Sequence, residues 1–147
     1  LVVVESQQAA LLPGAANMPM VLDTTRGQLP SLAESWAWAH VQATVTAGLP
    51  ADPAEALESM PEAFIARLTA PRLLQPRTDY LACVVPAFRG GVEAGLGQPV
   101  DAASSAQDAW DDDAGDDAPV LLPVYFSWSF ATGDAAPYRR ARLADDL

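Results

Sequence analysis

Basic residues are scarce in this chain of 147 residues, and lysine is absent altogether. The 8 basic residues are all arginines, and they stand against 19 acidic residues, which gives a formal net charge of −11. A nucleic-acid-binding protein needs a basic surface to contact phosphates, and an anionic membrane surface attracts basic segments. The charge balance therefore argues against both nucleic acid and a membrane as partners.

Cysteine and histidine each occur once, as Cys83 and His40. A single cysteine forms no internal disulfide, so we do not expect a disulfide-stapled secreted domain. A zinc site needs several imidazole or thiolate ligands, and the sequence contains no phosphate loop, dinucleotide fingerprint or nucleophile elbow. We therefore expect no cofactor.

Long apolar runs are also missing, since none approaches the roughly 18–20 residues that a membrane span requires. The chain starts within an apolar, strand-like run that has neither Met nor a basic leader, and its last residues, 137–147, have helical character. We therefore expect residues 1–147 to be a single domain cut from a longer polypeptide. Its expected location is the cytoplasm, or a particle that is assembled there.

Two long segments show the period-two alternation of a β-strand. In residues 35–45 two tryptophans and His40 share one face while alanines and valines share the other, and in residues 120–132 aromatic residues alternate with serines. We expect these two strands to pair with each other. Shorter strands are expected at 1–4, 18–23 and 78–85.

Two segments carry helix signals. Residues 52–69 contain Asp52 and Pro53 at a helix start, a second start at 59–62, and apolar residues at helical spacing that end at a proline. Residues 86–97 predict a second, shorter helix. Its glycines lack the Lys-Ser/Thr of a phosphate loop, so we expect them to serve turns and close packing.

These elements predict an α+β fold in which a mixed sheet of four to five strands carries two helices packed on one face. The alternative that the same elements allow is a β-sandwich with short helices.

Residues 98–119 hold seven aspartates and no basic residue, and thus contribute −7 of the net −11. A segment so charged and so poor in apolar groups is expected to be a mobile, solvated loop. Its carboxylates are ligands of the kind that calcium takes, with Asp111, Asp113 and Asp116 as the candidates for a metal site. Their spacing does not match a calcium-binding loop, so we expect no metal there.

Two alternatives assign a binding or catalytic role to single residues. In a hydrolase, His40 and Glu34 would be the catalytic candidates, and Cys83, inside an apolar strand, is expected to be structural. In a carbohydrate-binding module, Trp36, Trp38 and Trp128 would form an aromatic platform, although alternation favours a core role for them. Further carboxylates with no informative spacing are Glu5, Asp23 and Asp79.

Several stretches resemble a group of uncharacterised proteins from GC-rich bacteria. They are residues 34–42 (Glu-Ser-Trp-Ala-Trp-Ala-His-Val-Gln), 70–72 (Ala-Pro-Arg), 80–88 (Tyr-Leu-Ala-Cys-Val-Val-Pro-Ala-Phe), 95–97 (Gly-Leu-Gly) and 122–133 (Leu-Pro-Val-Tyr-Phe-Ser-Trp-Ser-Phe-Ala-Thr-Gly). The members are long chains associated with gene clusters of phage-tail-like contractile injection particles, and the resemblance implies such a context without implying an activity.

We therefore expect a non-enzymatic structural or protein-interaction module of a larger bacterial protein, with other protein segments or subunits as its partners. The basic residues are all arginines, and the guanidinium suits bidentate contacts with carboxylates of such a partner.

Overall fold

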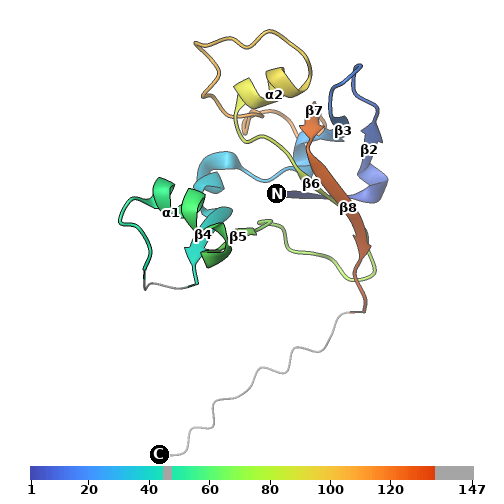
Figure 1. Ribbon diagram of the computed structural model, residues 1–147. Helices are drawn as coiled ribbons and strands as arrows, with labels where there is room; N and C mark the ends of the chain where they lie inside the picture. Colours follow the sequence, from blue (N-terminus) through green and yellow to red (C-terminus); the bar gives the residue numbers. More distant parts are fainter. Residues whose placement is uncertain (45–47, 135–147) are drawn as a thin grey trace, which may run out of the picture.

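A computed structural model describes residues 1–44 and 48–134 of the chain. In that part, eight strands form three antiparallel sheets, joined by two short α-helices and by 3₁₀ turns (Figure 1). The domain thus combines α and β elements, as the sequence predicts at this level. The predicted helical character of residues 137–147 lies outside the described residues.

Two of the sheets have three strands each. The first has the order β1-β6-β8 and consists of β1 (Val2–Glu5), β6 (Asp79–Val84) and β8 (Phe126–Ala131). The second has the order β2-β3-β7 and consists of β2 (Ala9–Leu12), β3 (Met20–Thr25) and β7 (Pro119–Val124). Two short connections join these sheets directly, from β1 to β2 through the 3₁₀ turn Ser6–Gln8 and from β7 to β8 across Tyr125.

The main core lies where these two sheets contribute side chains to one cluster. Alternate residues of a strand point to the same face. Strands β1 and β6 of the first sheet therefore contribute alternate residues to the cluster, and strands β3 and β7 of the second sheet contribute to it from the opposite side. The cluster consists of Val2, Val4, Leu22, Leu29, Leu32, Trp38, Leu81, Cys83, Trp110, Leu122 and Val124.

The single mixed sheet of four to five strands is a wrong prediction, because the strands are divided among three sheets and all pair antiparallel. A core shared by two sheets is closer to the alternative, the sandwich with short helices. The predicted strand at 120–132 is likewise divided at Tyr125, whose N–H donates to the Val84 carbonyl (3.0 Å).

The two helices do not pack on one common face. Helix α2 (Arg89–Gly95) lies against β7, where a Cβ on Gly95 would come within 2.5 Å of Pro123. Close packing was the predicted role of these glycines, and the contact confirms it for Gly95. Helix α1 (Pro53–Ser59) lies elsewhere, next to the 3₁₀ turn Pro61–Ala63.

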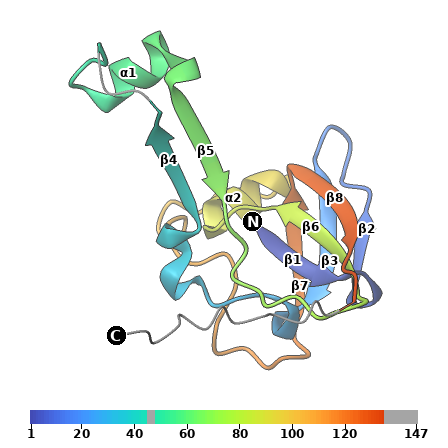
Figure 2. The same ribbon diagram turned by 90° about the horizontal axis from the view of Figure 1, so that it is seen from below.

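The third sheet is a two-stranded arm, which we define as β4 (Ala39–Ala43) paired with β5 (Phe64–Leu68). Figure 2 shows the arm extending away from the other two sheets, with α1 at its far end. The arm is attached to the core through the residue before β4, because Trp38 is buried in the core cluster and its carbonyl accepts from the Thr69 N–H (2.7 Å).

The arm corrects three predictions. The strand predicted at 35–45 begins only at Ala39, because the residues before it form the 3₁₀ segment Leu32–Ala37, capped by the Ser31 hydroxyl. The helix predicted at 52–69 ends at Ser59, and its second half is strand β5. Finally, β4 pairs with β5, whereas β8 pairs with β6, so the two tryptophan-bearing segments do not pair with each other.

Candidate functional site

The arm exposes an apolar face. Residues directly opposite each other in an antiparallel pair lie on the same face of the sheet, and on one face of the arm all the residues are apolar. They form three cross-strand pairs, Ala39 with Leu68, Val41 with Ala66, and Ala43 with Phe64. The largest side chains at its centre and base remain open to solvent, since Val41 is 56% exposed and Leu68 is 49% exposed.

The opposite face of the arm is polar except for Ile65. It carries His40 opposite Arg67 and Gln42 opposite Ile65, and the Arg67 guanidinium donates to the Gln42 side-chain oxygen (2.7 Å). The arm thus has the alternation of a strand pair that buries one face. On that face Ala43 and Phe64 are half-buried, and the other four residues are exposed. A two-stranded sheet is at best marginally stable in water unless it packs on something.

The two catalytic candidates of the alternative hydrolase hypothesis are not brought together. His40 is exposed on β4 and Glu34 is exposed in the 3₁₀ segment that precedes it. Glu34 lines a shallow cavity of about 410 Å³ together with Ser31, Trp38 and two prolines, and His40 does not contribute to it. No hydrogen bond joins the two side chains within the residues that the structure describes.

The other carboxylates are separated as well. Glu5 and Asp79 line one small polar cavity of about 200 Å³, but Asp23 and Glu34 do not reach it. The Glu5 carboxylate forms an ion pair with Arg72, whose Nη2 lies 2.6 Å from the Glu5 Oε1. Cys83 is fully buried in the core cluster, as its apolar strand predicts, and burial raises the pKa of its thiol to about 11.

The three tryptophans of the alternative carbohydrate-binding hypothesis lie in different surroundings. Trp38 is buried in the core, Trp36 is 80% exposed in the 3₁₀ segment, and Trp128 is half-exposed on β8. The aromatic neighbour of Trp128 is Phe126, with ring centroids 5.8 Å apart and planes tilted by 45°. The structure therefore does not bring the three tryptophans together into one flat platform.

The three aspartates named as candidate metal ligands, Asp111, Asp113 and Asp116, lie in the acidic segment. No group of three or more His, Cys, Asp or Glu side chains that could hold a metal is found among the described residues. The Asp111 carboxylate accepts from the Asp113 N–H (2.9 Å), which closes a local turn, and the carbonyl of Asp116 accepts from the Gly27 N–H (2.8 Å).

The middle of the acidic segment is attached to the core by Trp110, a residue that sequence reasoning missed. Its side chain is buried in the core cluster, and its indole N–H donates to the Pro30 carbonyl (2.8 Å). Beside it, Arg26 pairs with Asp112 (2.9 Å) and donates to the Asp111 carbonyl (3.0 Å). The single tryptophan among the aspartates is the sequence feature that could have predicted this contact with the core. The mobility of residues 98–119 stays a prediction.

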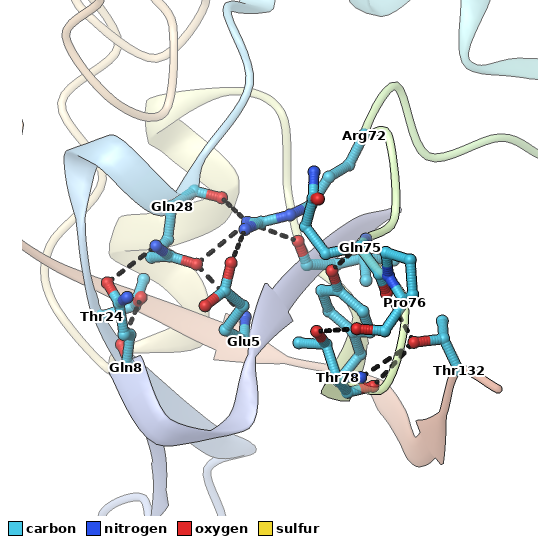
Figure 3. A network of polar contacts seen from close by, with 11 residues as sticks. Glu5, Gln8, Thr24, Gln28, Arg72, Gln75, Pro76, Thr78 and Thr132 are labelled. Atoms are coloured by element: carbon cyan, nitrogen blue, oxygen red, sulfur yellow. Dashed lines mark hydrogen bonds and ion pairs between the residues drawn. The ribbon is translucent and has the colours of Figure 1, made fainter. Parts of the chain in front are cut away.

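A second group that sequence reasoning missed covers the outer edge of β1 (Figure 3). Arg72 donates to the Val3 carbonyl (3.3 Å), to the Gln28 side-chain oxygen (2.9 Å) and to Glu5. Gln28 in turn accepts from the Glu5 backbone N–H (3.2 Å) and donates to the Gln8 side chain (2.8 Å). These side chains thus occupy backbone groups at the edge of the first sheet.

No protein-family model, no curated protein and no solved structure matches this chain. Within residues 1–44 and 48–134, no helix has the length and apolar character needed to cross a membrane.

Proposed function

We propose that this chain is a non-enzymatic protein-interaction module of a larger bacterial protein, and that the arm is its binding element. The observation that carries the proposal is the apolar face of the arm, with Val41 and Leu68 about half exposed at its centre and base. Adjoining exposed apolar side chains mark interaction sites more often than scattered ones do. Covering this face would remove apolar surface from water, which stabilises a complex by about 25 cal/mol for each Å² buried.

The geometry of the arm supports the same function. Figure 2 shows that the arm extends from the rest of the domain, and most of its residues are exposed. On the resemblance in sequence, we propose that this other protein is a subunit of a phage-tail-like particle assembled in the cytoplasm.

Site-specific photo-crosslinking in the source bacterium tests the proposal. A benzophenone amino acid replaces Val41 on the arm in one strain and Leu12 in another, since Leu12 is an exposed leucine on β2, outside the arm. We expect one defined partner to be crosslinked from position 41 and not from position 12. Leu68→Ser should weaken the crosslink from position 41 at least threefold, because Leu68 shares its face.

Equal crosslinking from positions 41 and 12, or none from position 41, would contradict the assignment of the arm. The particle context is checked separately by purifying the particle and probing it for this chain. A chain that is found only outside the particle would overturn that part of the proposal.

A further inference from the structure

The outer edge of β4 presents unused backbone groups. The Thr44 N–H donates to the Ala63 carbonyl and the Thr69 N–H donates to the Trp38 carbonyl, both at 2.7 Å, so the even-numbered residues of β4 face β5. Antiparallel ladders alternate, and the N–H and C=O of Ala39, Val41 and Ala43 therefore point away from β5. Within the described chain, none of them bonds to another element.

The outer edge of β1 is occupied by side chains, unlike that of β4. Arg72 and Gln28 occupy the Val3 carbonyl and the Glu5 N–H at the edge of β1. On β5, the Phe64 N–H is already donated to the Pro61 carbonyl. Proteins commonly protect edges with lysine, proline, a bulge or a covering segment, and β4 (Ala-His-Val-Gln-Ala) has none of the first three.

The charge of the arm indicates which kind of side chain a partner would place against it. Neither β4 nor β5 contains a carboxylate, although the whole chain has a net charge of −11. Arg26, Arg72 and Arg77 each pair with a carboxylate. Arg67 has only the neutral Gln42 side chain as its side-chain partner within the described residues, as Arg89 has only Gln107.

We infer that an extended segment of the partner protein adds to the arm as a third strand along the outer edge of β4. Its apolar residues, at every second position, would extend the apolar face at Val41, and a carboxylate between them would face His40 and Arg67. This binding mode, β-strand addition, takes affinity from backbone hydrogen bonds and specificity from alternate side chains. The inference rests on the proposed function and specifies how the arm binds.

A second copy of this chain fits the edge less well. Each copy carries a net charge of −11, and such charge favours the monomeric state. Two five-residue strands paired only by their edges would also fall short of the ~1,200 Å² that stable interfaces bury.

Two synthetic peptides test the inference on the full chain. One is acetyl-Val-Glu-Val-Glu-Val-Glu-amide, and the other has glutamine in place of each glutamate. In NMR titrations we expect the glutamate peptide to slow hydrogen exchange of the Val41 N–H at least tenfold and to bind at least fivefold more tightly than the glutamine peptide. Arg67→Gln should remove this preference.

Proline variants identify the edge. Val41→Pro deletes an N–H that points away from β5 and leaves the β4–β5 bonds in place, so it should weaken peptide binding at least tenfold. Ala66→Pro deletes the corresponding outward N–H of β5 and should change binding less than twofold. If either variant fails to fold, the hydrogen-exchange rate of the Val41 N–H in the unaltered chain still shows whether the peptide binds along the edge of β4.

The outcomes separate the inference from the proposed function. If position 41 captures a partner while the partner and the glutamate peptide leave Val41 exchange unchanged, strand addition is wrong and the interaction module stands. If position 41 captures nothing, the proposed function fails as well. A dimer in analytical ultracentrifugation that Val41→Pro dissociates would overturn the inference in favour of a second copy.

Discussion

Trp110 shows how one residue attaches an otherwise polar segment to the core. Its side chain is 5% exposed, and its indole N–H satisfies the Pro30 carbonyl at 2.8 Å. The acidic residues around it are solvated, so the indole supplies the apolar contact that they lack. This contact and the Arg26 ion pair hold residues 110–112 beside the segment that leads to the arm.

Trp110→Phe should therefore be costly. Phenylalanine keeps a ring but leaves the Pro30 carbonyl without its donor, and an unsatisfied buried group costs about 1–3 kcal/mol. The matched control is Trp36→Phe at a side chain that is 80% exposed, where we expect a change within about 0.5 kcal/mol. Urea unfolding measures both, and equal effects of the two substitutions would contradict this role of Trp110.

The ionisation of Cys83 makes the unfolding free energy depend on pH in the alkaline range. Burial raises the pKa of the thiol from 9.0 to about 11 in the folded chain, because the thiolate is poorly solvated there. Between these two values the unfolded chain has lost the proton and the folded chain retains it. The stabilising contribution is therefore complete below pH 9 and is lost as the pH rises towards 11.

Cys83→Ala isolates this contribution. The difference in unfolding free energy between the unaltered chain and the variant should be constant below pH 9. Above it, the advantage of the unaltered chain should shrink by up to about 1.4 kcal/mol per pH unit. Denaturant titrations from pH 7 to pH 10.5 measure this difference, and one that does not change with pH would show that the thiol ionises equally in both states.

At the scale of elements, α2 depends on a glycine for its position. A methyl group on Gly95 would lie 2.5 Å from Pro123 of β7, so Gly95→Ala forces the helix away from the strand. We expect a loss of about 1–3 kcal/mol, as for other overpacked sites. Gly115→Ala is the control, because nothing lies within 4 Å of its added methyl. Thermal unfolding compares the two, and a neutral Gly95→Ala would contradict the packing argument.

The arm shows why some elements could not be predicted from the sequence. Phe64 and Leu68 are four residues apart, which places them on one face of a helix, but with Ala66 they also form one face of a strand. Pairing with β4 decides between the two, and that contact joins residues far apart in the sequence. Strand β6 and helix α2 were predicted in about their correct places, because prolines and glycines delimit them locally.

The candidate site was predictable only in part. Alternation from Ala39 to Ala43 revealed two faces with different polarity, and the register confirms them. The position of β5 decides which backbone groups of β4 point outward and which face of the arm stays exposed. The sequence pattern predicts a helix at residues 52–69, where the structure has β5. The same limit applies to Arg72 and Glu5, which are 67 residues apart and meet only in the folded chain.

At the scale of the whole molecule, the charge is unevenly distributed. Seven of the 19 acidic residues lie between residues 98 and 119, and the arm has none. The core with its two three-stranded sheets has a covered β1 edge, while the arm has an open β4 edge and a mostly exposed apolar face. The molecule thus separates its acidic segment from a projecting arm, and the stability of the arm would increase on binding a partner.

The concentrated negative charge should make the folded state sensitive to salt. Like charges in the acidic segment repel one another, and the screening length falls from about 30 Å at 0.01 M ionic strength to about 10 Å at 0.1 M. We therefore expect the unfolding free energy to rise between 10 and about 200 mM NaCl.

Asp113→Asn should raise the unfolding free energy at low salt by up to about 0.5 kcal/mol, the size of an exposed charge interaction. Asp112→Asn makes the same change in charge but removes the ion pair with Arg26 and the contact with Ser31, so it should give no gain or a loss. Urea titrations at both salt concentrations measure the effects, and identical behaviour of the two variants would show that the Arg26–Asp112 pair does not hold the segment.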